Sequence, residues 1–201
     1  MIHMFSGIVE ASAKVINVIQ KNQAVVVQVR RPEDFVDLKV GDSIACNGAC
    51  LTLDQFDQQQ LSFVLAHETL KTLKINPDHL LGQIWNLERS LKFGDRVHGH
   101  LMTGHIEALG QIVKNEAFGD SWFLNVSVPR ELLKFIWKKG SLGLHGVSLT
   151  VNDVQDSIVS FCLIPETVRR TNLSQYQVGD FLNLETDYLA KAYLQSRSYE
   201  L

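Results

Sequence analysis

The chain has 201 residues, of which 45% are hydrophobic and 20% are charged, and its formal net charge is −3. This composition is typical of a globular chain that buries a core, in one large domain or two of about 100 residues each. Lys and Arg are scattered without a basic stripe, which argues against nucleic acid as a partner, and no apolar run approaches the roughly 20 residues that cross a bilayer.

The opening residues and the cysteines indicate where the protein works. The stretch "MIHMFSGIVE" lacks the basic and apolar regions of a signal peptide. Cys46, Cys50 and Cys162 are too few, and odd in number, for a secreted disulfide framework, and the spacing of the first two does not fit a zinc site. We therefore expect a cytoplasmic protein with free thiols, no metal and no membrane partner.

Four short sequences occur twice, in the same order and at offsets of 97 or 98 residues. The pairs are "SGIVEA" and "TGHIEA", "GDSIACNGACLTL" and "KGSLGLHGVSLTV", "SFVLAHETL" and "SFCLIPETV", and "GQIWNLER" and "GDFLNLET". This period exceeds that of solenoid repeats, so each copy should be a whole domain. We expect domains at residues 1–100 and 101–186, followed by a separate tail at 187–201.

The first copy reads mainly as short strands. "AKVINVIQ", "AVVVQV", "SIAC", "LTLDQF" and "LSFVLA" are rich in Val, Ile and Thr and are bounded by turn residues, with short helices expected at 31–38 and 67–74. The second copy repeats the pattern with "LGQIVKN", "WFLNVSV", "LTVNDV" and "IVSFCLI" and with helices at 129–138 and 165–172. About six strands in about 90 residues favour a small closed barrel, so the predicted fold class is all-β with short helices.

The tail "TDYLAKAYLQSRSYEL" predicts one amphipathic helix. Tyr188, Leu189, Ala192 and Tyr193 fall on one face of it. Such a stripe must be buried somewhere, so we expect the helix to pack against copies of itself in an oligomer.

Three histidines, His98, His100 and His105, lie within eight residues between the copies. They could hydrogen-bond locally, bind a metal or move a proton. A metal is disfavoured because no Asp or Glu lies among them to act as a second ligand shell. A proton-moving histidine agrees with the near-neutral pKa of imidazole.

Small polar residues recur at matching positions of the two copies. Cys50 becomes Ser148, while Thr52 and Thr150 follow on the same strand face. Each pair either contacts a ligand or satisfies backbone groups of the turn.

Two barrels with similar polar edges suit a reaction between two near-identical substrates. Holding both face to face makes a bimolecular step effectively unimolecular, an effect of up to about 7–11 kcal/mol. A dismutation needs no redox cofactor, and the sequence has no Gly-rich dinucleotide or P-loop motif. Asp187 and Lys139 occur in the second copy alone, which favours a role other than building the barrel.

Six motifs together resemble riboflavin synthase of the alpha-chain type, from Met4 to about Tyr193: "MFSGIVE", "NGACLTL", "GHLMTGHIEALG", "GVSLTV", "IPETVRRTNL" and "NLETDYLAK". The resemblance implies two six-stranded Greek-key barrels per chain and a homotrimer joined by the C-terminal helix. It implies conversion of two 6,7-dimethyl-8-ribityllumazine molecules into riboflavin and 5-amino-6-(ribitylamino)uracil by four-carbon transfer, without a metal or organic cofactor. The site would lie between barrels of neighbouring subunits, and lumazine synthase is a candidate partner.

The resemblance also implies which residues act. The first barrel would bind its ligand through Gly7, Ile8, Val9, Cys50, Leu51, Thr52, Val64, Leu65, Ala66, His67, Glu68 and Thr69. The second would use Gly104, His105, Ile106, Ser148, Leu149, Thr150, Ile164, Pro165, Glu166, Thr167, Val168 and Arg169, with Lys139 reaching in from the partner chain. Catalysis would involve Phe5, Ser43, Cys50, His105, Ser148 and Asp187. Of these, His105 would move the 7-methyl proton, whereas Ser148 and Asp187 would position or activate the nucleophile that adds at C7 of the other lumazine.

Three residues depart from the family's usual pattern. His145 and Val64 each replace an Asp, which changes the charge beside Ser148 and removes a polar ligand contact, and Thr103 replaces a Ser. The alternative is a non-catalytic lumazine- or flavin-binding protein, like the fluorescent antenna proteins of luminous bacteria. The enzyme is favoured by five retained residues: Cys50, His100, His105, Ser148 and Thr150. A purely structural trimer would explain the helix but not the paired polar residues.

Overall fold

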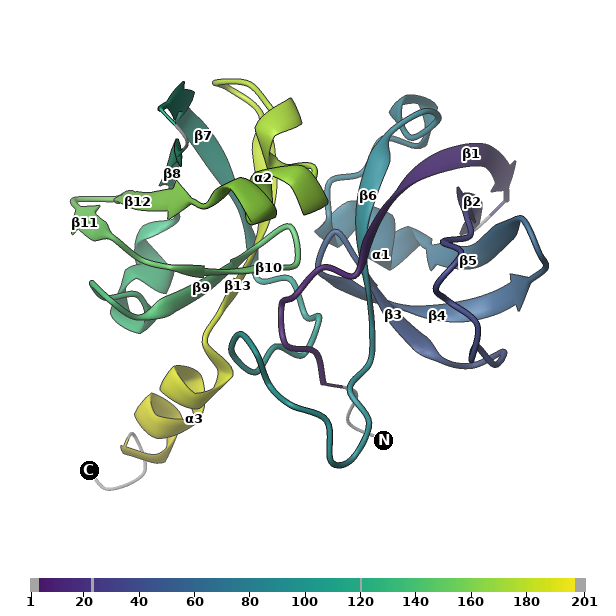
Figure 1. The fold of residues 1–201 in the computed structure, drawn as a ribbon, viewed down its shortest axis with the longest axis horizontal. Coiled ribbons are helices and arrows are strands. Elements are labelled where there is room, and N and C mark those ends of the chain that lie inside the picture. The colour runs from purple at the N-terminus through teal and green to yellow at the C-terminus, as the bar shows by residue number, and fades with distance from the viewer. Residues whose placement is uncertain (1–3, 23, 120, 198–201) are drawn as a thin grey trace.

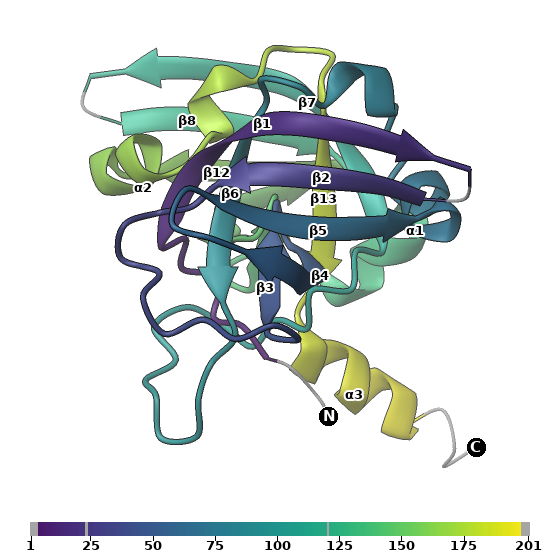
Figure 2. The ribbon, with the colours of Figure 1, turned by 90° about the vertical axis from the view of Figure 1, so that its right-hand side faces the viewer.

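The computed structural model describes residues 4–22, 24–119 and 121–197. A closed β-barrel and a second, curled β-sheet, which we call the second barrel, lie side by side, and helix α3 (Tyr188–Arg197) extends away from both (Figures 1 and 2). The predicted all-β architecture with short helices is confirmed. Within the described ranges, no helix has the length and apolar character needed to cross a membrane.

The first barrel is closed, with the strand order β1-β2-β5-β4-β3-β6. Its strands are β1 (Ala11–Lys21), β2 (Ala24–Arg30), β3 (Ser43–Cys46), β4 (Ala49–Phe56), β5 (Gln60–Ala66) and β6 (Ile84–Arg89). Along β4, Leu51 and Leu53 are buried while Thr52 and Asp54 are exposed. This alternation fills the barrel with apolar side chains and leaves polar ones on its outer surface.

The second sheet follows the same order with one strand broken. Its strands are β7 (Ala108–Phe118), β8 (Ser121–Ser127), β9 (Ser141–Leu144), β10 (Val147–Thr150), β11 (Asp153–Gln155), β12 (Ile158–Leu163) and β13 (Phe181–Thr186), in the order β10-β9-β13-β7-β8-β12-β11. The edge strands β10 and β11 together correspond to the continuous β4 of the first repeat. Between them, Val151 N bonds to Gly140 O on one side and Asn152 N bonds to Ser160 O on the other. The predicted six-stranded topology holds, with this one strand corrected.

The helices agree with the sequence only in part. Helices α1 (His67–Thr72) and α2 (Pro165–Arg170) form as predicted, each with a glutamate in its first turn. Three short 3-10 helices are η1 (Pro77–His79), η2 (Arg130–Phe135) and η3 (Leu173–Gln175). Residues 31–38 form turns instead of the predicted helix, and 129–138 yields only η2. Within residues 31–38, Phe35 and Leu38 are both buried and lie three residues apart, a spacing that also occurs on one face of a helix. So short a segment does not form a stable helix by itself.

The barrels meet through two equivalent hairpin turns. Asn47-Gly48 and His145-Gly146 both have positive φ at each residue, as a two-residue type I′ turn requires. A Cβ added to Gly48 would lie 2.6 Å from Gly146 N, so the turns touch backbone to backbone. Asn183 Nδ2 donates to Asn47 O at 2.9 Å, and Asn86 Nδ2 donates to His145 O at 3.0 Å. The repeats are thus related by an approximate two-fold axis through this contact.

Candidate active site at the barrel lips

The repeated segments 5–9 and 102–106 cross at the centre of the molecule. Phe5 N donates to Met102 O at 2.8 Å, and Met102 N donates to Phe5 O at 3.0 Å. Val9 packs in the core of the second barrel, whereas Ile106 packs against the core of the first. Each barrel is therefore completed by the segment that precedes the other one.

A buried glutamate fixes the bend of each crossing segment. Glu88 of β6 accepts hydrogen bonds from Ser6 N at 2.7 Å, Ser6 Oγ at 2.8 Å and Gly7 N at 3.0 Å. Glu185 of β13 accepts the equivalent bonds from the backbone and hydroxyl of Thr103 and from the next N–H. Burial raises the pKa of Glu88 to about 7 and also raises that of Glu185, although these hydrogen bonds act in the opposite direction.

Each segment then contacts the opposite barrel. Gly7 O accepts from Ser148 N at 2.7 Å, and Gly104 O accepts from Cys50 N at 2.9 Å. A Cβ on Gly7 would lie 2.6 Å from Ser148 Cβ, and one on Gly104 would lie 2.5 Å from Cys50 Cβ. Both glycines also have positive φ, so only glycine fits either crossing.

These contacts correct the expected grouping of the site residues. The segment Gly7 to Val9 was expected at the first barrel but lies against the second, and Gly104 to Ile106 lies against the first. We define two surfaces from this geometry. The first lip comprises residues 50–52, 64–69 and 104–106, and the second lip comprises residues 7–9, 148–150 and 164–169.

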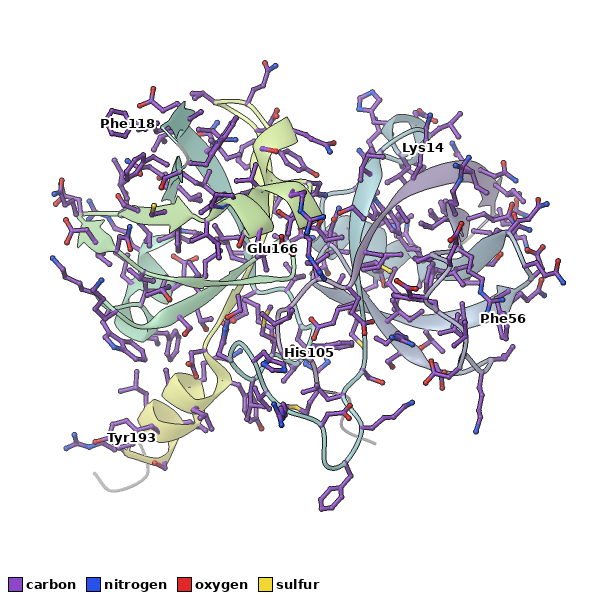
Figure 3. All side chains as sticks on the ribbon, in the orientation of Figure 1. Lys14, Phe56, His105, Phe118, Glu166 and Tyr193 are labelled. Atoms are coloured by element: carbon purple, nitrogen blue, oxygen red, sulfur yellow. The ribbon has the colours of Figure 1, made fainter. Side chains whose placement is uncertain are left out.

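Both lips present side chains to solvent. Thr52, Val64 and His105 are exposed on the first lip, and Thr150 and Ile164 on the second. His105 lies at the junction of the barrels (Figure 3). Leu51, Leu65 and Leu149 point into the barrel cores instead. These three can shape a lip from beneath but cannot contact a ligand on the outer surface.

Ser148 is paired with His100, not with His105. His100 Nδ1 lies 2.7 Å from Ser148 Oγ. Burial lowers the pKa of His100, and the negative charge of Asp187 offsets this only partly. Its Nε2 is buried without a hydrogen-bond partner among the described residues. A neutral imidazole with its proton on Nε2 can accept the hydroxyl proton, so this pair is the clearest acid–base unit at either lip.

The other two linker histidines lie apart from this pair. His98 and His105 are both exposed. In the described part of the chain, no three His, Cys, Asp or Glu side chains gather in an arrangement that could hold a metal ion.

Beneath the first lip, Phe5, Ser43 and Cys50 occupy neighbouring positions. Phe5 is buried and packs with Ala45 and Met102, with Cys50 alongside. Burial raises the pKa of the Cys50 thiol, despite a hydrogen bond with Ser43. The thiol therefore stays protonated at neutral pH, and this makes it a poor nucleophile. The structure favours a supporting role for all three residues.

Asp187 has a structural task, and Lys139 has an unusual backbone. Asp187 Oδ1 accepts from Leu189 N at 2.8 Å and Ala190 N at 3.2 Å, which makes Asp187 the N-cap of α3.

Lys139 is exposed with φ of 69°, at the position where the first repeat has Gly41. A non-glycine residue in this conformation costs roughly 1–2 kcal/mol. Such strain is typical of functional positions.

His145 carries no charge at neutral pH and makes a structural contact, so the expected change of charge relative to an Asp stays a prediction. Its Nδ1 accepts from Asn183 N at 2.8 Å, as Asn47 Oδ1 accepts from Asn86 N in the first repeat. Burial lowers the pKa of His145 to about 3, so the imidazole is neutral. At the contact between the barrels, His145 Nδ1 is the acceptor in the second repeat, as Asn47 Oδ1 is in the first.

Sequence reasoning missed three residues of this region. Glu88 and Glu185 are the glutamates of the repeated motifs "NLER" and "NLET". A charged residue that recurs at a buried position of both repeats is a signal that could have identified them. His100 was noted among the linker histidines, but no spacing rule could link it to Ser148, which lies 48 residues later.

Comparison with known proteins agrees with the repeat. The lumazine binding domain family matches residues 6–90 and again residues 103–187. The riboflavin synthase of Escherichia coli K12 is 37% identical over 188 residues, which cover 92% of this chain and 87% of that protein. The riboflavin synthase of Brucella abortus is 34% identical over 201 residues, covering 98% and 100%. The chain belongs to the riboflavin synthase family. It is accordingly an enzyme of the transferase class.

Solved structures share the fold of this riboflavin synthase family member. LumP complexed with 6,7-dimethyl-8-(1'-D-ribityl) lumazine superposes with a TM-score of 0.78 at 20% identity, and LumP complexed with riboflavin with 0.81 at 21%. Each comparison covers 90% of this chain and 98% of the other. At this identity the likeness extends to the fold alone.

Proposed function

We propose that the protein converts two molecules of 6,7-dimethyl-8-ribityllumazine into riboflavin and 5-amino-6-(ribitylamino)uracil. The observation that supports this most is the pair of equivalent lips, each made of a crossing glycine segment against a small polar residue. Two like surfaces suit two like substrates. The names of the relatives and the lumazine bound to LumP point to the same ring.

In this proposal the lips hold the two rings by backbone and small polar groups. Residues 50–52, 64–69 and 104–106 bind one lumazine, and residues 7–9, 148–150 and 164–169 bind the other. The glycines at 7 and 104 let the backbone come close to a flat ring. Exposed Thr52 and Thr150 can hydrogen-bond its polar edge.

The chemistry divides between the two lips. Loss of a proton from the 7-methyl group of one lumazine leaves a carbanion that can attack the second ring, and His105 is the proposed proton carrier. At the second lip, a water molecule adds at C7 of the other lumazine as its proton passes to Ser148 Oγ, while the hydroxyl proton of Ser148 passes to His100 Nδ1. Asp187 contributes its negative charge near His100. His100 acts through Ser148 and is therefore a positioning residue, and no metal or organic cofactor enters the scheme.

The assembly is part of the proposal. Tyr188, Leu189, Tyr193 and Leu194 are exposed on α3 in the single chain. Burying them against copies of the same helix gives a homotrimer in which the first lip of one subunit faces the second lip of its neighbour, with Lys139 reaching across. Three free cysteines among the described residues support the cytoplasm as the compartment. Lumazine synthase, which would supply the substrate, remains a proposed partner.

A lumazine-binding protein without turnover is the second candidate, because the fold neighbours are LumP complexes and Val64 makes part of the first lip apolar. One assay separates the two. The pure protein is incubated with 6,7-dimethyl-8-ribityllumazine while riboflavin absorbance is followed. Formation of riboflavin supports the enzyme, whereas tight binding with lasting lumazine fluorescence and no product supports the binder.

A further inference from the structure

A cleft of about 430 Å³ lies between the barrels, away from the outward-facing residues of either lip. Its floor is the end of the first barrel, where Leu80 and Trp85 are buried, and its far wall is formed by Tyr176, Phe181 and Asn183 of the second repeat. Ligand sites in proteins typically have this volume, occur between domains and combine apolar walls with a few polar groups.

The approximate two-fold axis relates the cleft to an equivalent space between the barrels, and the two spaces differ in what fills them. On the opposite side of the axis, buried Asn172 fills the equivalent space. Its backbone N donates to Asn86 Oδ1 at 2.9 Å, and its Nδ2 donates to Asn47 Oδ1 at 3.0 Å and to Ile84 O at 2.8 Å. The counterparts of Asn86, Asn47 and Ile84 are Asn183, His145 and Phe181. All three of these line the cleft.

At the offset of 98, the residue of the first repeat that corresponds to Asn172 is Lys74, which lines the cleft. The offset between the repeats falls from 98 at Glu68 and Glu166 to 97 at Gly82 and Gly179, so this connection is one residue longer in the first repeat. Among the described residues, Asn183 Oδ1 lacks the bond that Asn86 Oδ1 accepts from Asn172 N, and 8% of Asn183 is exposed. Asn183 lines the cleft, so its Oδ1 is an acceptor available to an N–H donor of a ligand.

The rim of the cleft favours a negative charge. Lys74 and His79 are exposed at its mouth, and no described residue lining it is an Asp or Glu. Two aspartates lie next to this rim in the chain and keep their negative charge, because Asp78 accepts from Gln20 Nε2 and Asp180 from Gln177 N, both neutral amide groups. Lys74 is also one of the few non-glycine residues with positive φ, at 49°. This conformation directs the chain away from the ordinary helical path at the mouth.

We propose that this cleft is a second binding site, distinct from the lips, for a planar heteroaromatic molecule with a ring N–H and an anionic tail such as a phosphate ester. The ring would lie against Trp85 and Tyr176, with its N–H donating to Asn183 Oδ1. The anion would lie between Lys74 and His79. This inference does not depend on turnover at the lips.

FMN and riboflavin are a suitable pair of probes, because they share one ring with an N–H and differ only in the phosphate. Quenching of Trp85 fluorescence is followed in the full chain carrying Trp122→Phe and Trp137→Phe. We expect saturable quenching by both, with FMN bound about tenfold more tightly, as a charge-assisted phosphate contact provides.

Two rim variants and a matched control test the assignment. Lys74→Asn keeps a residue type that tolerates positive φ, and His79→Glu reverses the charge at an exposed position. Each should remove most of the preference for FMN, whereas Lys71→Asn, at an exposed lysine that does not line the cleft, should keep it. The proposal would be overturned if all three variants kept the same preference for FMN over riboflavin, or if neither flavin quenched the fluorescence of Trp85. Neither result would bear on riboflavin formation at the lips.

Discussion

Replacing Gly7 with alanine tests the crossing of the segments. The new Cβ would lie 2.6 Å from Ser148 Cβ and 2.7 Å from Met102 Sδ, at a backbone φ of 72°. The left-handed conformation itself costs an alanine about 1–2 kcal/mol. Overpacking adds about 1–3 kcal/mol, and weakening the hydrogen bond between Gly7 O and Ser148 N adds about 1 kcal/mol.

Gly119→Ala is the matched control, because Gly119 also has positive φ, at 59°, but nothing lies within 4 Å of its added Cβ. Both variants carry the backbone cost, so the difference between them isolates the crossing. We expect Gly7→Ala to lower the free energy of unfolding by about 2–4 kcal/mol more than Gly119→Ala, measured by urea unfolding. Equal values for the two variants would refute the crossing of segments 5–9 and 102–106.

The remaining predictions concern catalysis, acid stability and assembly. Ser148→Ala and His100→Gln should each lower kcat by about 100-fold or more, the range of a lost acid–base group, and leave lumazine binding measured by fluorescence within about threefold. Because burial lowers the folded pKa of His145 to about 3 from 6.5, the contribution of His145 to the free energy of unfolding is complete above pH 6.5 and should fall by about 3 kcal/mol by pH 4. Burial raises the pKa of Glu88, which acts in the opposite direction over this range, so the measurement is the difference between the unmodified protein and His145→Asn in urea unfolding. That difference should shift by about 3 kcal/mol in favour of His145→Asn between pH 7 and pH 4. If α3 joins the proposed homotrimer, Leu189→Glu with Tyr193→Glu should yield monomers in light scattering, and a trimer that survives would exclude α3 as its contact.

The duplication and the fold class could be predicted from the sequence because they depend on local patterns. Strand alternation, turn residues and the "NG" and "HG" turns are all local signals. The exchange of segments between the barrels could not be predicted. Either barrel offers an equivalent apolar place for Val9 or Ile106, and the choice is made by long-range geometry that a repeat makes ambiguous.

The sequence predicted a set of candidate site residues but not how they are arranged. The structure brings the expected segments to two lips, but it exchanges their glycine segments and pairs Ser148 with His100. The error at residues 31–38 has another cause. Phe35 and Leu38 are buried by turns, and a two-residue match to helical spacing does not distinguish the two conformations.

The central claim is that riboflavin formation needs both lips, and that each active site combines the first lip of one subunit with the second lip of its neighbour. Thr52→Trp would block the first lip and Thr150→Trp the second, since both threonines are exposed and point away from the cores. Each variant alone should form no riboflavin, whereas trimers made by co-expressing the two should regain activity at the interfaces that combine two open lips. Full riboflavin formation by either variant alone would contradict the account.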